Sequence, residues 1–404
     1  MKKIDGWVTT PQGFLAAGVK AGIKASGNHD VAVIYSTVPA ATGAVFTQNK
    51  MCAAPVLVSR KVAAKSYAQA IVVNSGCANA CTGEQGLKDA EAMQAQTAEL
   101  LGVENDAVYV CSTGVIGHFM PMDKLAKGIA DAVDAMDETG GESCAMAIQT
   151  TDTFIKHAAY EFELGGKTVK IAGIAKGAGM IHPNMATMLV FLTTDCAISA
   201  KMLQQALSGD VSETFNMVSV DGDTSTNDMV TLLANGMAGN AEITAPGADF
   251  DAFMQALNTV TVYLCRRIAG DGEGATKLLE CKVTGAATHE IAKTVAKSVI
   301  CSSLTKAAMF GADANWGRVL CAIGYSGADV DVTKIDVAFR SPAGTVAVCQ
   351  NGAGIPFSEE QAKSILSESE IEILVELNAG SAASTAWGCD LTYDYVKING
   401  DYRT

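Results

Sequence analysis

The stretch Lys176-Gly177-Ala178-Gly179-Met180-Ile181-His182-Pro183-Asn184-Met185-Ala186-Thr187-Met188-Leu189 is the most informative part of this sequence. Its glycines permit positive φ angles and let the backbone approach a reacting group closely. Pro183 fixes its own φ and pushes His182 toward an extended conformation. A β-run then begins at Thr187, so a hydroxyl group occupies the first position of an otherwise apolar strand. That position suits a side chain that points into a site.

Local chemistry leaves two interpretations of this stretch open. In the simpler one it is a loop–strand junction, and Thr187 is an ordinary strand residue. In the other the glycine-rich turn builds a reactive site around the Thr187 hydroxyl. A phosphate-binding loop is a weaker third interpretation, because the pattern GxxxxGK[ST] is absent and Lys176 precedes the glycines.

Three further segments could carry chemistry. Thr113-Gly114 follows a predicted strand and could present a hydroxyl and a backbone N–H together, as an oxyanion hole requires, although a plain strand exit is more common. The segment 270–274, Gly-Asp-Gly-Glu-Gly, could turn a carboxylate toward a ligand amine, or be a solvated turn. Residues 221–228 are rich in aspartate, but Leu232 occupies the twelfth position, where a calcium loop of the EF-hand type needs glutamate.

Short apolar runs alternate with alanine-rich helical stretches, which predicts a mixed α/β (α+β) fold. Strands are predicted at 71–74, 109–111, 169–175 and 188–193. Helices are predicted at 82–101 and 249–268. The first of them should begin with a capping box made by Thr82 and Gln85 and end at Gly102.

The pattern of predicted helices and strands changes near residue 280, where we place an approximate domain boundary. A helix at 289–301 is followed by predicted strands at 346–349, 371–377 and 387–395. The run 391–399 alternates like a strand, and Asn399-Gly400 could form a tight turn at its end.

Composition excludes several classes of function. The 404 residues suffice for two or more domains, and 49% hydrophobic with 18% charged residues is typical of a compact soluble protein. The net charge of −14 argues against nucleic-acid binding. No apolar run approaches the ~20 residues of a membrane helix, and Asp5 interrupts any signal-peptide segment. Twelve cysteines without a CxxC pair, and five scattered histidines, indicate reduced thiols, no metal site and a cytoplasmic protein.

Many motifs in one order resemble the ornithine acetyltransferase (glutamate N-acetyltransferase) family of arginine biosynthesis. They run nearly from end to end of the chain, and their number reverses the preference for the simpler interpretations above. The matching segments are 13–14, 21–24, 43–47, 74–76, 78–83, 112–114, 150–153, 176–189, 221–228, 271–277 and 313–318.

The resemblance implies an αββα sandwich of the N-terminal-nucleophile type over residues 1–280, and a smaller α+β domain over 281–404. It implies self-cleavage between Ala186 and Thr187, with two α and two β chains forming a heterotetramer. No cofactor is implied. The partners are N-acetylornithine and glutamate, and whether acetyl-CoA also serves as a donor stays open.

The resemblance also assigns the site residues. Thr187 is the nucleophile, and Thr113 with Gly114 forms the oxyanion hole. Substrate contacts come from Thr153, Lys176, Thr187, Glu273, Asn399 and Thr404. This sequence departs from the family pattern at Ile155, where a proline is expected, which could shift the loop that carries Thr153.

Elementary chemistry supports this assignment. A threonine hydroxyl is a weak nucleophile and needs a nearby base. A freed α-amine has a pKa of about 7.7–8.0, so cleavage before Thr187 would supply that base. The acetyl group would pass from N-acetylornithine to Thr187 and then to glutamate, in a ping-pong reaction. Lys176 could bind the substrate α-carboxylate and Glu273 an amine.

Two alternatives remain. A hydrolase of the same fold, an aminopeptidase or amidase, would pass the acyl group to water, although the relatives considered carry serine at the cleavage point. An unprocessed binding protein would use the pocket for amino acids without catalysis, and would remain one intact chain.

Overall fold

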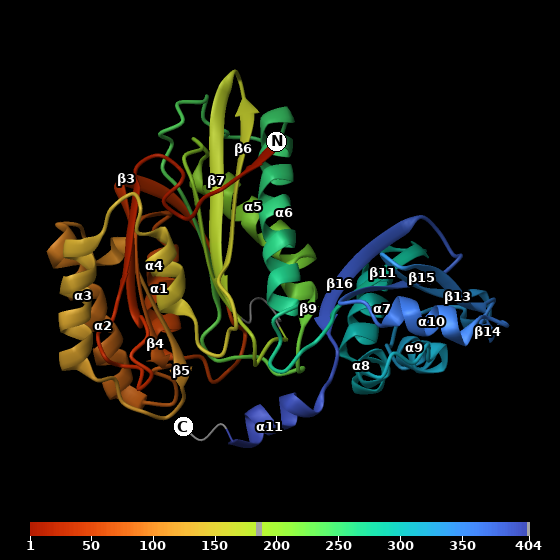
Figure 1. Cartoon of the computed structure of the whole chain (residues 1–404). Helices are drawn as coiled ribbons and strands as arrows, with labels where there is room; N and C mark the ends of the chain where they lie inside the picture. The colour runs from red at the N-terminus through yellow and green to blue at the C-terminus, as the bar shows by residue number, and fades with distance from the viewer. Residues whose placement is uncertain (183–187, 402–404) are drawn as a thin grey trace.

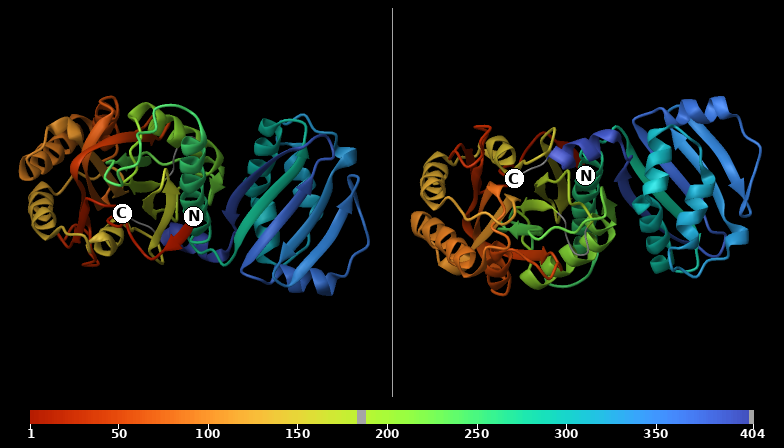
Figure 2. Two further views of the ribbon diagram at one scale, coloured as in Figure 1. Left: turned by 90° about the horizontal axis from the view of Figure 1, so that it is seen from above. Right: turned by 90° about the horizontal axis from the view of Figure 1, so that it is seen from below.

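The structure is a computed structural model that describes residues 1–182 and 188–401. The described chain forms two β-sheets, each with its own helices, and they lie side by side in an elongated molecule (Figures 1 and 2). The first sheet has nine strands and the second has seven, counted over these described residues.

The first sheet is continuous but changes direction at β3 (Val31–Phe46). The first half of β3 pairs with β2 (Phe14–Val19) and β4, whereas its second half pairs with β10 and, at Ala40 and Ala41, again with β4. The register shifts between Tyr35 and Ala40, a stretch that contains Pro39, which has no N–H for the ladder. The sheet order is β1 (Lys2–Ile4), β6 (Lys156–Leu164), β7 (Lys167–Lys176), β8 (Leu189–Thr194), β10 (Met229–Ala234), β3, β4 (Tyr67–Cys77) and β5 (Val108–Val115).

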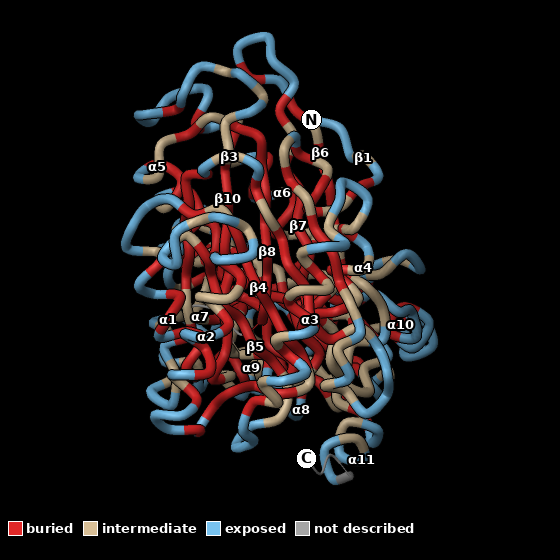
Figure 3. Tube along the Cα trace, turned by 90° about the vertical axis from the view of Figure 1, so that its left-hand side faces the viewer, coloured by how far each residue is buried: buried red, intermediate tan, exposed pale blue. Residues whose placement is uncertain are grey.

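Helices cover both outer faces of this bent sheet. On one side lie α1 (Ala54–Ala63), α2 (Gly83–Leu101) and α3 (Met122–Ala135), and on the other α5 (Ala200–Glu213) and α6 (Ala248–Ala269), whereas α4 (Gly141–Ile148) packs against β2 and β3 (Figure 1). Alternate residues of β8 separate into two cores. Leu189 and Phe191 join the core between the two strand layers, and Val190 and Leu192 join the core with α5 and α6. The central strands are buried along most of their length (Figure 3). The predicted αββα layering is therefore confirmed, with both strand layers belonging to one sheet.

Apart from β9, the strands of the second sheet follow one another from β11 onward, and the boundary proposed near 280 lies inside β11. The strand order is β14 (Ala353–Gly354), β13 (Gly344–Gln350), β12 (Asp336–Ser341), β15 (Glu370–Glu376), β11 (Leu278–Ala286), β16 (Ala382–Cys389) and β9 (Val218–Ser219). Its β9 comes from much earlier in the chain and pairs with β16. The accompanying helices are α7 (His289–Cys301), α8 (Ser303–Phe310), α9 (Trp316–Gly324) and α10 (Glu359–Leu366).

The helix predictions for α2, α6 and α7 are confirmed, and α2 ends at Gly102 in the left-handed conformation. The predicted capping box of α2 is wrong. The Thr82 hydroxyl donates to Asn79 Oδ1 (2.7 Å) and the Gln85 amide to Asp89 Oδ1 (2.8 Å), so neither side chain caps the helix.

The predicted C-terminal strand is wrong as well. β16 ends at Cys389, and α11 (Tyr393–Asp401) follows as a helix. Between Tyr393 and Gly400 only Tyr395 and Ile398 are half-buried, and this spacing of three residues suits one helix face. Asn399 and Gly400 consequently lie in a helix instead of a turn.

Among the helices of the described residues, none combines the length and apolar character that crossing a membrane would need.

Candidate active site

A pocket of about 190 Å³ opens where the ends of β5 and β7, the loop after α6 and helix α11 come together. Five of the residues predicted for the site line it, although they come from four separate parts of the chain. These are Thr113, Gly114, Lys176, Glu273 and Asn399.

Thr113 and Gly114 lie at the end of β5, which runs parallel to β4. Gly114 has a φ of +130°, and a Cβ at this position would lie 2.4 Å from the carbonyl carbon of Gly76. Only glycine therefore permits this approach of the two strands. Asn227 donates to the Ser112 carbonyl (2.9 Å) and ties the strand end in place. The Thr113 hydroxyl and the neighbouring backbone are thus held rigidly at the pocket wall.

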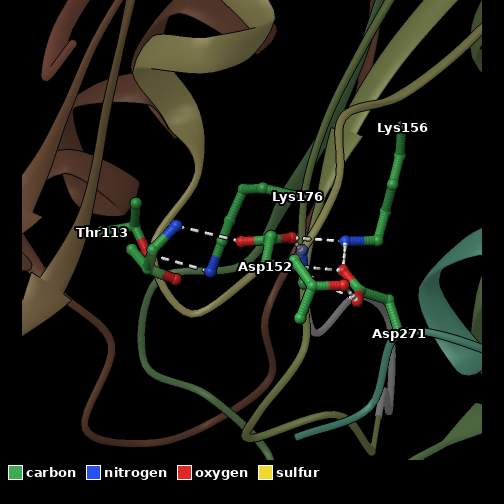
Figure 4. A network of polar contacts seen from close by, with 8 residues as sticks. Thr113, Asp152, Lys156, Lys176 and Asp271 are labelled. Carbon is green, nitrogen blue, oxygen red and sulfur yellow. Dashed lines mark hydrogen bonds and ion pairs between the residues drawn. The ribbon is translucent and has the colours of Figure 1, made fainter. Parts of the chain in front are cut away.

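Lys176 is the last residue of β7 and is buried. Its Nζ lies 3.4 Å from Thr113 Oγ1, and Figure 4 shows the two side chains pointing toward one another. Burial lowers the pKa of Lys176, whereas the carboxylates of Asp152, Asp228 and Glu273 oppose that shift. One end of the pocket therefore holds a hydroxyl donor and an amine that can bind an anionic group.

Glu273 provides the opposite charge. Its N–H donates to the Ala178 carbonyl (2.9 Å), and its carboxylate accepts from Asn399 Nδ2 (2.9 Å). The carboxylate lies so close to Gly179 that a Cβ there would be 2.5 Å from a carboxylate oxygen. The glycine-rich turn thus allows Glu273 to approach its backbone, and the pocket carries an acidic and a basic group.

Asp221 lines the pocket too, and its role was not recognised in the sequence. Its carboxylate accepts from the N–H groups of Met180 (2.7 Å) and Ile181 (2.9 Å), and burial raises the pKa of Asp221. The Thr224 hydroxyl donates to the His182 carbonyl (2.8 Å). The aspartate-rich run that could be mistaken for a calcium loop therefore binds the backbone of residues 180–182 instead.

Three other residues that line the pocket were not predicted from the sequence. Tyr395 on α11 was assigned to a strand, and burial, with Asp221, Asp223 and Glu273 nearby, raises its pKa. Thr150 and Thr151 also line the pocket. Their only signal was the motif 150–153, which carried the family resemblance but assigned a contact only to Thr153.

Thr153 was also predicted for the site, but it does not line the described pocket. Thr153 is exposed, and its N–H and hydroxyl both donate to Asp271. Ala186, Thr187 and Thr404 lie outside the described residues. Beyond this gap Leu189 pairs with Lys176 across β7 and β8, so the described chain continues beside the pocket. A catalytic or binding role for each of these residues stays a prediction.

Comparison with known proteins agrees with the resemblance seen in the sequence. The ArgJ family model matches residues 15–404. Two similar proteins, each named arginine biosynthesis bifunctional protein ArgJ, come from Caldanaerobacter subterraneus subsp. tengcongensis and Symbiobacterium thermophilum. They are 52% identical over 404 residues and 51% identical over 406 residues, and the matches span 100% of every chain.

A solved structure is similar as well, that of arginine biosynthesis bifunctional protein argJ from Bacillus halodurans. It is 49% identical, has a TM-score of 0.50, and the match covers 52% of this chain and 98% of the solved chain. The family match over most of the chain and the full-length identities confirm the predicted family. The chain belongs to the ArgJ family.

Proposed function

We propose that this protein transfers an acetyl group from N-acetylornithine to glutamate through an acetyl-Thr187 intermediate. The observation that carries the proposal is the pairing of charges in one pocket, with Lys176 beside Thr113 and Gly114, and Glu273 bonded to Asn399. An N-acetylated diamino acid offers the matching groups, a carboxylate, an amide carbonyl and a side-chain ammonium.

Each group of such a substrate has a partner in the proposal. Lys176 binds the α-carboxylate, and Glu273 binds the side-chain ammonium of ornithine. The Thr113 hydroxyl and the Gly114 N–H donate to the carbonyl oxygen, where negative charge develops in the transition state. Donors held by a parallel strand pair need little reorganisation at that moment, which favours catalysis.

The reaction proceeds in two halves. The Thr187 hydroxyl attacks the acetyl carbonyl while the α-amine of Thr187 takes its proton. The C–N bond then breaks, the ornithine nitrogen receives the proton, and the acetyl group remains as an ester on Thr187. In the second half the amine of glutamate attacks this ester, and N-acetylglutamate leaves as the threonine hydroxyl is restored.

Self-cleavage between Ala186 and Thr187 creates the α-amine that this scheme needs. Contacts on both sides of this bond favour the proposal, because they hold the chain before and after it beside the pocket. Asp221 and Thr224 bind the backbone of residues 180–182, and Leu189 pairs with Lys176. The cut would give fragments of 186 and 218 residues. The solved Bacillus halodurans chain, matched over 98% of its length, corresponds to only 52% of this chain, which fits a division near the middle.

The names of the two similar proteins extend the proposal. Both are called bifunctional arginine biosynthesis proteins, and the matches span their whole length. We therefore include acetyl-CoA as a second donor, which would acetylate Thr187 and so lead to N-acetylglutamate without N-acetylornithine. The two fragments would assemble as two copies of each, which sedimentation of the processed protein can measure.

Intact-mass measurement and an acetyl-transfer assay test this function. The wild type should resolve into fragments of 186 and 218 residues and convert N-acetylornithine and glutamate into ornithine and N-acetylglutamate. Thr187→Ala should stay one chain without activity, and Thr187→Ser, which keeps a hydroxyl, should still be cleaved.

The alternatives predict other results. Acetate released from N-acetylornithine without glutamate would indicate a hydrolase. A wild type that remains intact after prolonged incubation, and binds amino acids without turnover, would indicate a binding protein. Cleavage of Thr187→Ala at the same bond would refute the assignment of the nucleophile.

A further inference from the structure

Three charged side chains form a buried ion network behind the pocket. Lys156 Nζ lies 2.6 Å from Asp152 Oδ1 and 2.5 Å from Asp271 Oδ2, and the three side chains are between 0% and 2% exposed. Figure 4 shows Lys156 directed toward both carboxylates. The network joins the start of β6 to the loop that precedes it and to the turn after α6.

One end of the network holds the backbone next to Lys176. The Asp152 carboxylate accepts from the N–H of Gly177 (2.7 Å) and from the N–H of Thr150 (2.9 Å). Burial alone would raise the pKa of Asp152, but Lys156 and Lys176 hold it at about 2. Asp152 is thus an ionised acceptor that fixes where β7 ends.

The other end holds the loop that carries Glu273. Asp271, two residues before Glu273, accepts the N–H of Thr153 (3.0 Å) as well as the Lys156 ammonium. The N–H of Glu273 then donates to the Ala178 carbonyl, which returns the loop to the glycine-rich turn. The backbone on each side of the pocket is therefore tied to the same lysine.

We propose that the Asp152–Lys156–Asp271 network is a positioning element that fixes the spacing between Lys176 and Glu273, and so makes the pocket selective for substrate length. This inference rests on the proposed function only in taking an amino acid with two charged ends as the ligand. Asp152, Lys156 and Asp271 act through Lys176 and Glu273 and do not line the pocket.

Energetics support a positioning role over a stabilising one. Burying three charges costs desolvation, and well-packed apolar side chains of similar volume often stabilise a protein as much or more. A lysine bonded to two carboxylates, however, restricts the geometry of three segments at once. Binding groups that are held at a fixed spacing can discriminate between ligands of different length, because a longer or shorter ligand cannot reach both groups in their best geometry.

Binding of a ladder of diamino acids tests the inference on the processed protein. Isothermal titration calorimetry with 2,4-diaminobutyrate, ornithine and lysine measures the preference for length independently of turnover. In a hydrophobic pocket one methylene is worth roughly 10- to 200-fold. Here a change of length also separates a substrate charge from Lys176 or Glu273, so the wild type should prefer ornithine over both homologues by about tenfold or more. Asp271→Asn keeps the volume but removes the charge, and should reduce the preference about tenfold or more.

Asp210→Asn is the matched control. Asp210 is also a buried carboxylate, which accepts from Asn258 (2.9 Å) and Thr214 on the remote α5 side, and it does not line the pocket. Its replacement should leave the ladder unchanged. If Asp271→Asn does not fold, Asp152→Asn tests the network from its other end.

A purely structural role would lower the affinity for all three ligands by the same factor, and an unchanged ratio in Asp271→Asn would overturn the inference. A wild type without length preference would overturn it too. The transfer assay separates the two proposals. If the protein shows the expected length preference but no acetyl transfer, only the proposed function is refuted. If it transfers acetyl groups but shows no length preference, only the positioning role is refuted.

Discussion

Replacing Gly114 by alanine tests the rigid strand pair at the pocket wall. The new Cβ would lie 2.4 Å from the carbonyl carbon of Gly76 and 2.7 Å from the Cys77 nitrogen. Both are backbone atoms of the paired strand β4, so no side chain can rotate away. The residue would also retain a φ of +130°, which L-residues other than glycine rarely adopt.

The two effects can be estimated separately. A strained backbone conformation costs about 1–3 kcal/mol. Forcing extra atoms into a packed region costs a further 1–3 kcal/mol or so. Together they should lower the free energy of unfolding by about 2–6 kcal/mol, a large part of the 5–15 kcal/mol typical of a domain. Movement of the Gly114 N–H should also lower turnover by roughly 10²–10³.

Gly117→Ala is the matched control, because Gly117 has a φ of +83° but open space where its Cβ would lie. It shares the conformational cost of Gly114→Ala without the overlap. Denaturant unfolding and acetyl-transfer kinetics of both variants give the comparison. A Gly114→Ala variant as stable and active as Gly117→Ala would refute the argument that strand approach requires glycine at 114.

Three other predictions can be checked alongside. Thr113→Ala should lower kcat by about 10²–10³ because one oxyanion donor is lost. Steady-state kinetics of the processed variant measure this effect, and near-wild-type turnover would indicate that Thr113 has only a structural role. Because the folded pKa of Asp152 is about 2, below its ordinary 3.8, its stabilisation is present above pH 3.8 and lost as pH falls toward 2. As the pH is lowered between these values, the free energy of unfolding of the wild type should therefore fall by up to about 2 kcal/mol more than that of Asp152→Asn, as denaturant unfolding will measure. The same pH dependence in both proteins would contradict this. Deleting residues 402–404 should leave folding and cleavage intact but raise KM, lowering kcat/KM for N-acetylornithine and glutamate roughly ten- to hundredfold by loss of one or two hydrogen bonds; unchanged kinetics would mean the tail is dispensable.

Local patterns predicted the elements whose signals lie within a few residues. Helix α2 has Gly102 directly after its last turn, and α7 was predicted with the bounds that the structure has. These signals work because they act on the dihedral preferences of consecutive residues. The same approach failed at 391–399, where alternation indicated a strand but the segment forms α11. A strand needs a partner with free backbone groups, and no local pattern reveals whether one is present.

The candidate site was predicted in part. The resemblance pointed to Thr113, Lys176 and Glu273, and the structure brings them to one pocket. Asp221 and Tyr395 were missed, since their places in the site depend on contacts with residues far away in the sequence. Asp221 belongs to a motif that carried the resemblance and was considered as a possible calcium ligand, but its contacts to the backbone at 180–181 could not be foreseen.

From the sequence alone, apolar periodicity determined the mixed α/β character. The order of the motifs determined the family and, through the resemblance, the αββα class and the chemical types at the pocket, because neither signal requires knowledge of contacts. Only the tertiary structure decided that Lys156, a strand residue that could equally face solvent, is buried between Asp152 and Asp271. The charge state and role of an ionisable group depend on burial and on partners through space, here 115 residues apart along the chain. For this reason the residue types of the pocket could be predicted from the sequence, whereas the ion network behind it became visible only in the tertiary structure.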